Sequence, residues 1–446
     1  MIRKLLRRVF FLRGAPVGRR PETLSLREHG IQREQVSPGA RRVCETLQQA
    51  GFKAYVVGGA VRDLIAGIPP KDFDVATNAT PEQVRALFRR ARIIGRRFQI
   101  VHVLQGAETV EVSTFRAIHD ESTIKDKHGR VLRDNVWGTI AEDAARRDFT
   151  INALYYDPQT ETVLDYHKGV QDLQRRTLRM IGDARARYRE DPVRMLRAVR
   201  MAAKLDLRLH PAVQAPIQEM AELIGNVPAA RLFDEMLKIL TSGHAVACVR
   251  RLREEGLHHG LLPLLDVILE QPLGEKFVML ALADTDRRVR DGKPLSPGFL
   301  FATLLWHEVL ANWEKRKAGG ELPLPALHEA MNEVLDVQGE KLAITRRITG
   351  DIKEIWLLQP RFEKRSGRAP LRLLEQPRYR AAFDFLRLRA ESGEVSSELY
   401  DWWREFQEAS DERRAALLQP ETGRKRRRSR GRGARPAAAD VSPLPA

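Results

Sequence analysis

One change of pattern divides this sequence and limits the folds open to it. Short β-forming runs alternate with helical stretches between residues 37 and 157, whereas from Glu190 to about residue 420 helical segments rich in Leu, Ala and Arg follow one another. Periodicity of this kind separates a mixed α/β unit from a helical one. Because 446 residues also exceed what one core usually organises, the sequence predicts a small α/β domain followed by a mainly α-helical region.

The formal net charge of +17 is concentrated at the two ends of the chain. Residues 1–21 hold seven Lys or Arg and no acid, and residues 421–446 hold eight against Glu421 and Asp440, which leaves about +4 between them. The last segment combines Arg, Gly, Pro and Ala without periodicity, so we expect it to be a disordered tail. Cationic ends of this kind indicate polyanionic partners.

Cysteines and apolar runs bear on where the protein works. Cys44 and Cys248 are far apart and lack metal-ligand spacing, which argues against a disulfide scaffold and a zinc site and fits a reducing cytoplasm. No apolar run reaches the roughly 18 residues that a membrane span requires. The Arg-rich start is a plain basic arm, or else a transit segment or membrane-surface helix. We expect a cytoplasmic protein, with peripheral membrane contact through this arm as the alternative.

Local signals place the first elements. Ser37 fits the cap of a helix that Gly51 ends, and the β-rich run at residues 53–57 predicts a strand directly after it. Thr80, followed three residues later by Gln83, is close to a capping box. Further strands are expected at residues 98–104 and 109–115.

Two carboxylates carry the first chemical signal. Asp72 and Asp74 are expected at the start of a strand, where residues two apart face the same side. Two anions placed together repel unless a cation lies between them, and a pair of Mg²⁺ ions about 3.5 to 4 Å apart would satisfy them. Such a pair alone is weak evidence, because most are exposed turn or strand-edge residues.

A glycine pair before these acids strengthens the signal. Gly58 and Gly59 follow a predicted strand and precede a helix, where backbone N–H groups can approach a phosphate closely. Arg62, one turn on, could add a charge-assisted contact to a triphosphate. A plain strand-to-helix turn, with Asp63 as a first-turn acid favoured by the helix dipole, is the simpler interpretation.

Together, GGAVRD and KDFDVAT resemble the nucleotidyltransferase superfamily of DNA polymerase β, in the class that contains bacterial poly(A) polymerases and tRNA CCA-adding enzymes. The resemblance covers residues 37–240. It implies an α/β nucleotidyltransferase head, a mixed sheet with flanking helices, before a mainly α-helical neck and body. It also implies that Asp72 and Asp74 hold Mg²⁺, while Gly58, Gly59 and Arg62 hold the triphosphate of ATP.

This class usually needs a third acid, and two candidates stay open. Glu111 lies between Val110 and Val112, so its side chain should face away from theirs and towards the metals. Asp148 belongs to RRDFTINAL, which resembles a second signature of the class. In that signature the resemblance implies that Arg147, Asp148 and Asn152 surround the nucleotide and its sugar.

A third segment, REDPVRMLRAVRMAAKL, resembles the motif with which the class reads the incoming base. Asp191 fits an N-cap, and Arg194 and Arg197 are neighbours on one helix face. Without the resemblance, capping plus a solvated basic face is the preferred interpretation of these residues. With it, Asp191, Arg194 and Arg197 become candidates to present donors and acceptors to a base edge.

Other segments distinguish the bacterial poly(A) polymerases from the CCA-adding enzymes of this class. The stretch at residues 93–103, with Gly95, Arg96, Arg97 and Phe98, resembles bacterial poly(A) polymerases rather than CCA-adding enzymes, as does LLEQPRYRAAFDFLRLRAE at residues 373–391. Phosphate contacts by Arg378 and Arg380 with base stacking by Tyr379, or a packed helix with a basic side, are equal interpretations of the latter. Trp402 and Trp403 are expected in the core.

The sequence thus predicts a polynucleotide adenylyltransferase that adds AMP from ATP to RNA 3′ ends without a template. RNA 3′ ends, ATP and proteins of mRNA processing and decay are the expected partners, and the oligomeric state stays open. A tRNA CCA-adding enzyme is the alternative, since it shares the catalytic residues, and a non-catalytic RNA-binding protein is a further one. The expected segments are a basic arm (1–36), the catalytic head (37–170), a helical neck with the base-recognition motif (171–245), a helical RNA-binding body (246–420) and a disordered Arg-rich tail (421–446).

Overall fold

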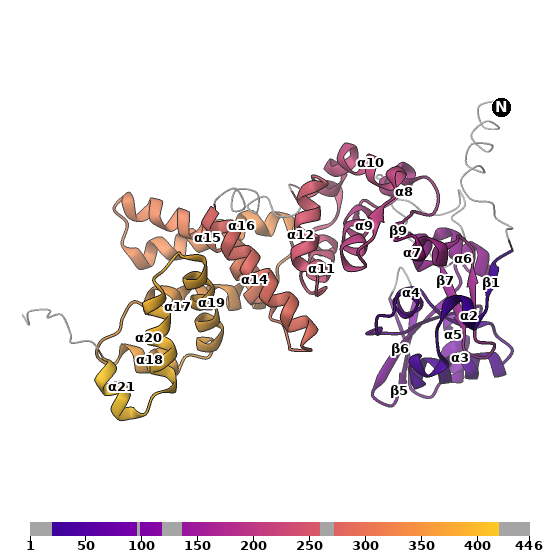
Figure 1. The fold of residues 1–446 in the computed structure, drawn as a ribbon, viewed down its shortest axis with the longest axis horizontal. Helices are drawn as coiled ribbons and strands as arrows, with labels where there is room; N and C mark the ends of the chain where they lie inside the picture. Colours follow the sequence, from indigo (N-terminus) through magenta and orange to yellow (C-terminus); the bar gives the residue numbers. More distant parts are fainter. Residues whose placement is uncertain (1–19, 96–98, 118–135, 259–271, 419–446) are drawn as a thin grey trace, which may run out of the picture.

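The computed structural model describes residues 20–95, 99–117, 136–258 and 272–418. Figure 1 shows an elongated arrangement, with an α/β head at one end, a helical body at the other and the neck helices between them. The predicted α/β head followed by a mainly helical region is therefore confirmed. Among the described residues, no helix is long and apolar enough to cross a membrane.

An eight-stranded mixed sheet forms the head, in the order β1-β8-β7-β2-β3-β6-β5-β4. β3 and β6 are parallel, and the other neighbours are antiparallel. The strands are β1 (Glu22–Leu24), β2 (Ala54–Val57), β3 (Asp74–Thr77), β4 (Ala91–Ile94), β5 (Ile100–Gln105), β6 (Glu108–Thr114), β7 (Leu154–Asp157) and β8 (Thr162–Asp165).

Helices cover the two faces of this sheet unequally. They are α2 (Leu26–His29), α3 (Pro38–Gln49), α4 (Gly59–Ile65), α5 (Pro81–Leu87), α6 (Ile140–Arg146) and α7 (Gly169–Gln174). α3 and α5 pack on one face against the alternate residues Val56, Val75 and Val112. A smaller cluster with Ala76, Tyr155 and Ala144 of α6 covers part of the other face. The side chains of Asp74 and Glu111 lie on this second face.

Cap signals predict the helix starts well. The Ser37 side chain accepts a hydrogen bond from Ala40 N, and Thr80 forms a complete capping box with Gln83. These ends follow from residues three positions apart, so local sequence suffices to place them.

The expected boundary between arm and head is wrong. β1 pairs with β8 at the edge of the sheet, and Ile31 and Val36 are fully buried in the head core, so residues 22–36 belong to the head. β1, β4, β7 and β8 were not predicted as strands. Each is three or four residues long, which is too short for a clear alternation signal.

In the described part of the neck and body, the two-residue β9 (Thr177–Leu178) and β10 (Arg208–Leu209) are the strands, and the other regular elements are helices. Their helices are α8 (Ala184–Glu190), α9 (Val193–Lys204), α10 (Pro211–Met220), α11 (Ala229–Leu240), α12 (Ala245–Glu254), α14 (Pro272–Arg290), α15 (Pro297–Ala318), α16 (Pro323–Lys341), α17 (Arg346–Leu358), α18 (Ala369–Leu374), α19 (Tyr379–Ser392), α20 (Ser397–Glu408) and α21 (Asp411–Leu417).

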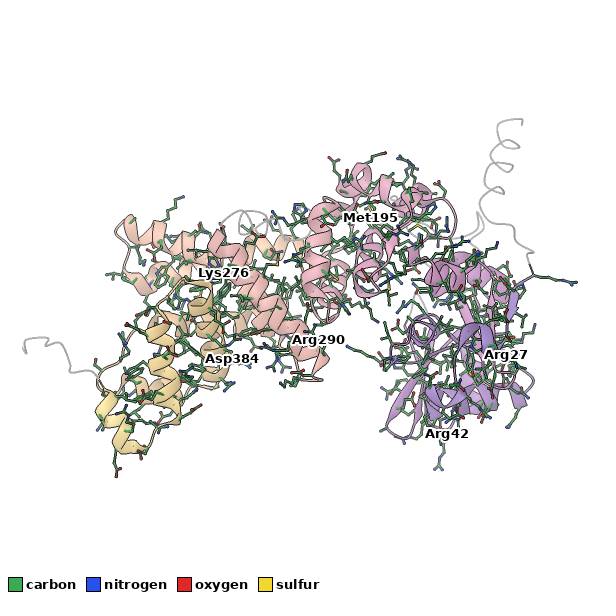
Figure 2. The ribbon with its side chains drawn as sticks, viewed as in Figure 1. Arg27, Arg42, Met195, Lys276, Arg290 and Asp384 are labelled. Carbon is green, nitrogen blue, oxygen red and sulfur yellow. The ribbon has the colours of Figure 1, made fainter. Side chains whose placement is uncertain are left out.

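One hydrophobic core runs from the neck into the body. It includes fully buried Met195 of α9, labelled in Figure 2, and extends to Leu388 of α19. The predicted boundary at residue 245 therefore does not separate two cores.

A second helical core closes the C-terminal part. Trp403 is fully buried, which confirms the prediction of a core residue there. Trp402 is half-buried; it packs against this core and stacks on Phe406 with ring centroids 4.7 Å apart. Tyr379 is also buried and stacks on Phe383, which makes its interpretation as a base-stacking platform wrong. Arg378 pairs with Asp351, as a packed helix with a basic side would predict.

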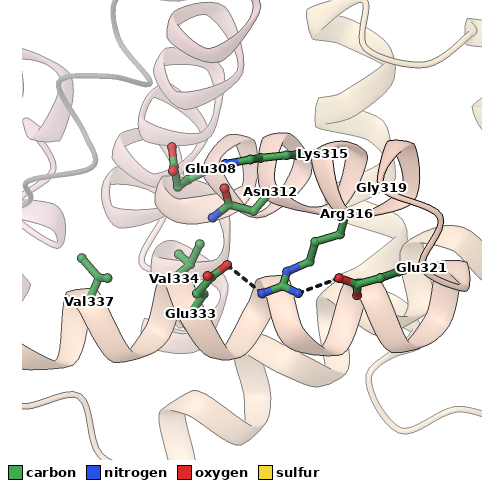
Figure 3. Close-up of a pocket in the computed structure, with 9 residues that line it drawn as sticks. All are labelled: Glu308, Asn312, Lys315, Arg316, Gly319, Glu321, Glu333, Val334 and Val337. Carbon is green, nitrogen blue, oxygen red and sulfur yellow. Dashed lines mark hydrogen bonds and ion pairs between the residues drawn. The ribbon is translucent and has the colours of Figure 1, made fainter.

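A hollow of about 480 Å³ lies between α15 and α16 in the body (Figure 3). Arg316 crosses it and pairs with both Glu321 and Glu333. None of the predicted site residues lines this hollow, so it plays no part in the site described below.

Candidate active site

Two carboxylates face each other across the only described parallel strand pair of the head. Asp74 opens β3, and its register partner on β6 is Glu111, so the side chains project from the same face of adjacent strands. Val110 and Val112 are buried while Glu111 is 52% exposed, as the alternation predicted. The acids therefore lie on the more open face of the sheet.

Asp72 does not lie in the strand as expected. β3 begins at Asp74, and Asp72 is in the preceding loop. Phe73 between them is buried and both acids are exposed, so the extended alternation continues through the loop and keeps the two carboxylates on one side.

Burial and neighbouring negative charge both act on Asp74. Partial burial, followed by the nearby charge of Glu111, raises the pKa of Asp74 to about 6. Asp72 adds to this rise, and Arg147 opposes it. Among the described residues, no group of three or more His, Cys, Asp or Glu forms a ready-made metal site. The acids are close enough to interact, and the repulsion among them is of the kind that a bound cation relieves.

The glycine turn lies beside these acids because Val57, the last residue of β2, is the register partner of Asp74. Gly58 has φ +70°, a conformation that favours glycine. A Cβ at Gly58 would lie 3.1 Å from Nη1 of Arg147. Gly59 is the first residue of α4. This turn therefore leaves room for an arginine directly beneath it.

Arg147 is held in place by two partners that sequence reasoning missed. Asp143 Oδ2 accepts hydrogen bonds from Arg147 Nε and Nη2 at 3.2 and 3.1 Å, and from the Tyr155 hydroxyl at 2.7 Å. Burial would raise the pKa of Asp143, but Arg147 and Tyr155 hold it below its ordinary value. The four-residue spacing of Asp143 and Arg147 is a helix-pair signal that could have revealed this contact.

Arg62 has a different environment from the one expected. Its side chain is 7% exposed, and its guanidinium donates to Asp63 Oδ1 at 2.8 Å and to Asn152 Oδ1 at 2.6 Å. These contacts are internal to the protein, so the triphosphate role of Arg62 stays a prediction.

Both carboxylate oxygens of Asp148 contact residues other than Asp72, Asp74 and Glu111. One oxygen accepts from Asn152 Nδ2 at 2.9 Å and from Phe149 N at 2.8 Å, and the other pairs with Arg197 Nη2 at 2.6 Å. Burial would raise the pKa of Asp148, but Arg197, Asn152 and Phe149 hold it below its ordinary value. Asp148 thus links the head to α9 of the neck.

The base-recognition candidates gather where α8 meets α9. Asp191 is the C-cap residue of α8 and Pro192 the N-cap of α9, so the predicted N-cap is one residue early. Arg194 Nη1 donates to the Arg187 carbonyl at 2.8 Å. Asp191 Oδ1 and Arg197 Nε are buried atoms to which no described residue hydrogen-bonds. An acceptor and a donor are therefore left for a ligand.

Three domain families match the sequence. They are "Poly A polymerase head domain" over residues 54–179, "Probable RNA and SrmB- binding site of polymerase A" over residues 206–269, and "Polymerase A arginine-rich C-terminus" over residues 319–436. The chain is 47% identical over 394 residues to poly(A) polymerase I of Haemophilus influenzae, which covers 86% of this chain and 87% of that protein. The chain belongs to the poly(A) polymerase family.

This chain also shares its fold with a CCA-adding enzyme. The crystal structure of Bacillus stearothermophilus CCA-adding enzyme in complex with CTP has a TM-score of 0.55 and 26% identity, covering 86% of this chain and 84% of that chain. The CCA-adding enzyme of Levilactobacillus brevis is 41% identical over 202 residues, or 45% of this chain and 50% of that enzyme. This poly(A) polymerase family member is therefore a nucleotidyltransferase.

Two site neighbours of this poly(A) polymerase family member come from parts of the chain without a local signal. His102 Nε2 lies 3.3 Å from Glu111 Oε1 on the adjacent strand, and Arg187 donates to the carbonyl oxygens of Arg146 and Arg147. Gly95 follows β4 with φ +88°. Several residues used in the sequence analysis lie outside the described ranges: Arg96, Arg97, Phe98, the start of the basic arm and the Arg-rich tail.

Proposed function

We propose that this nucleotidyltransferase adds AMP from ATP to RNA 3′ ends without a template. The observation that carries the proposal is the pairing of Asp74 with Glu111 beside the glycine turn, in a chain 47% identical to poly(A) polymerase I over most of both lengths. The reaction joins the RNA 3′ oxygen to the α-phosphorus of ATP and releases pyrophosphate.

Asp72, Asp74 and Glu111 are the proposed Mg²⁺ ligands. All three are exposed on one side of the sheet, and after burial the charges of Glu111 and Asp72 also raise the pKa of Asp74, which a cation would counteract. Oxygen donors of this type are those that Mg²⁺ prefers. When bound, Mg²⁺ would lower the pKa of the RNA 3′ hydroxyl and stabilise charge on the leaving pyrophosphate.

Arg147 and the backbone of Gly58 and Gly59 are proposed to hold the triphosphate. Arg147 lies under the turn, and Asp143 and Tyr155 fix its guanidinium before any ligand arrives. A donor oriented in advance loses little entropy on binding. Arg62 is proposed to support the same turn from within the head.

Asp191, Arg194 and Arg197 are proposed to read the base. The unpaired Asp191 Oδ1 can accept from an exocyclic amino group, and the unpaired Arg197 Nε can donate to a ring nitrogen. Asn152 and Asp148 would lie between this pair and the triphosphate, because Asn152 contacts Arg62 on one side and Asp148 on the other.

The competing function is CCA addition, which the whole-chain fold similarity to a CTP-bound CCA-adding enzyme keeps open. Incubation of the purified protein with RNA, Mg²⁺ and each nucleoside triphosphate in turn distinguishes the two. We expect long tails with ATP alone. Efficient CMP addition that stops after a fixed few residues would contradict adenylation.

The catalytic role of the carboxylates is tested in the same assay. Asp74→Asn and Asp72→Asn should each abolish addition while leaving the unfolding temperature within a few degrees of the original protein. Full activity in either variant would favour a non-catalytic RNA-binding protein. Roles in mRNA decay, cytoplasmic location and a peripheral membrane contact of the basic arm stay predictions.

A further inference from the structure

A continuous polar network connects two positions on α9 through side chains of the head. At its first end, Lys204 Nζ lies 2.7 Å from Asp63 Oδ2. The other oxygen of Asp63 accepts from Nε of Arg62 at 2.8 Å. Arg62 also donates from Nη1 to the Met201 sulfur of α9 at 3.2 Å. The helix that follows the glycine turn is thus tied to the C-terminal half of α9.

The network closes on the other half of the same helix. Arg62 donates to Asn152 Oδ1, Asn152 donates to Asp148 Oδ1, and Asp148 Oδ2 pairs with Arg197. Arg197 and Lys204 are seven residues apart, which is two helical turns or about 10 Å along one face. α9 is therefore attached to the head at two points, and its rotation about its own axis is restrained.

The central side chains of this network are buried, so each partner matters to the others. The side chains of Arg62, Asp63 and Asp148 are at most 8% exposed, whereas Lys204 is 24% and Arg197 is 42% exposed. A buried charge without its partner is expensive, and the surrounding groups move to replace that partner. Removal of the Lys204 ammonium group should therefore shift Asp63 and Arg62 rather than leave them in place.

We propose that Asp63 and Lys204 are positioning residues for nucleotide selection: together they set the orientation of α9, and so of Arg194 and Arg197, relative to the glycine turn. This inference rests on the proposed function of those arginines. Neither Asp63 nor Lys204 contacts the nucleotide in this scheme. Their effect passes through Arg62 on one side and through the backbone of α9 on the other.

A simpler role would be stability alone, and a matched control separates the two. Arg389 and Glu394 form another buried pair, with side chains 9% and 7% exposed and atoms 2.7 Å apart, within the body. Glu394→Gln removes a charge of comparable burial without touching the head or α9. It should lower the unfolding temperature and leave nucleotide choice unchanged.

The test measures kcat and KM for ATP and CTP on one RNA primer, well below each variant's unfolding temperature. Asp63→Asn and Lys204→Met should each reduce the ratio of kcat/KM for ATP to that for CTP about tenfold. Lys204→Arg, which keeps the charge, should restore most of the ratio. The double variant should show no further reduction, because both changes break the same ion pair.

An unchanged ratio in folded Asp63→Asn and Lys204→Met proteins would overturn the inference, as would an equal change in Glu394→Gln. An equal fall in activity with both nucleotides would also overturn it, because it would indicate a general structural role. If the unaltered protein prefers CTP, the proposed adenylation fails, but the ratio is then measured against CTP and the positioning role is tested in the same way.

Discussion

Glu111 and Asp148 show how two acids that are equal candidates in the sequence differ in the structure. Asp148 has both oxygens occupied by Arg197, Asn152 and a backbone N–H, whereas Glu111 is exposed opposite Asp74. The pKa of Asp74 responds to Glu111 and Asp72. These contacts favour Glu111 as the third metal ligand and a nucleotide-side role for Asp148.

Substitution of each acid should therefore have a different effect. Glu111→Gln should lower kcat by about 100-fold and raise the Mg²⁺ concentration that gives half-maximal rate, with little change in unfolding temperature. Asp148→Asn should instead lower the unfolding temperature, because Arg197 would be left without its buried partner. Mg²⁺ titrations of the rate and thermal unfolding curves check both. The reverse pattern would make Asp148 the metal ligand.

Both the backbone conformation at Gly58 and the neighbouring Arg147 side chain require glycine at this position. In Gly58→Ala, the alanine would have to adopt φ +70° and ψ −124°, a sparsely populated backbone conformation that costs about 1 to 3 kcal/mol, and its Cβ would crowd Arg147. We expect a higher KM for ATP in addition to the lower stability. Gly51→Ala is the matched control, because Gly51 has φ +86° with no atom within 4 Å of the added Cβ. A normal KM in Gly58→Ala would contradict the role of the turn.

At the scale of elements, helix starts were easier to predict than strands. The caps of α3 and α5 depend on residues three positions apart, which any sequence displays. The edge strands β1 and β4 are short, and only their pairing with β8 and β5 makes them strands. The start of α9 was one residue off because Asp191 follows α8 directly.

The stability that α6 and the segment after it provide should fall in acid. Asp143 and Asp148 have pKa values below their ordinary range, because their arginine and hydrogen-bond partners outweigh burial. Their stabilising effect is thus complete above the unfolded Asp value of about 3.9 and is lost as pH falls through the lower folded values. The unfolding temperature, followed by circular dichroism, should drop steeply below about pH 4. Asp148→Asn protein should show a smaller drop, and an equal one would contradict this cause.

Over the whole molecule, the hydrophobic cores and the net charge are distributed differently along the chain. One core joins neck and body and takes in Phe149 and Ile151 of the head, while the rest of the head has its own core. The head meets α9 through this shared core and through charged contacts. Most of the net charge lies instead in the two terminal segments. We therefore expect catalysis and nonspecific RNA attraction to be separable.

Removal of residues after Leu418 tests this separation. The deleted segment contains the eight basic residues of the tail, which can bind RNA phosphates without reading sequence. RNA affinity at physiological salt should fall, and the slope of log K against log salt should become shallower by roughly 0.7 for each RNA phosphate that the shortened protein no longer binds. Fluorescence anisotropy at several salt concentrations measures this, with kcat at saturating RNA as the control. An unchanged slope would show that the tail does not bind RNA.

By itself, the sequence determined the order of an α/β head and a helical region, and the caps of α3 and α5. These follow from neighbours close along the chain, through alternation, capping and turn chemistry. Only the tertiary structure decided that Glu111 lies opposite Asp74, that Asp148 pairs with Arg197, and that Asp63 and Lys204 tie the head to α9. The reason is that contacts between charged residues far apart in sequence are set by how the sheet and helices pack.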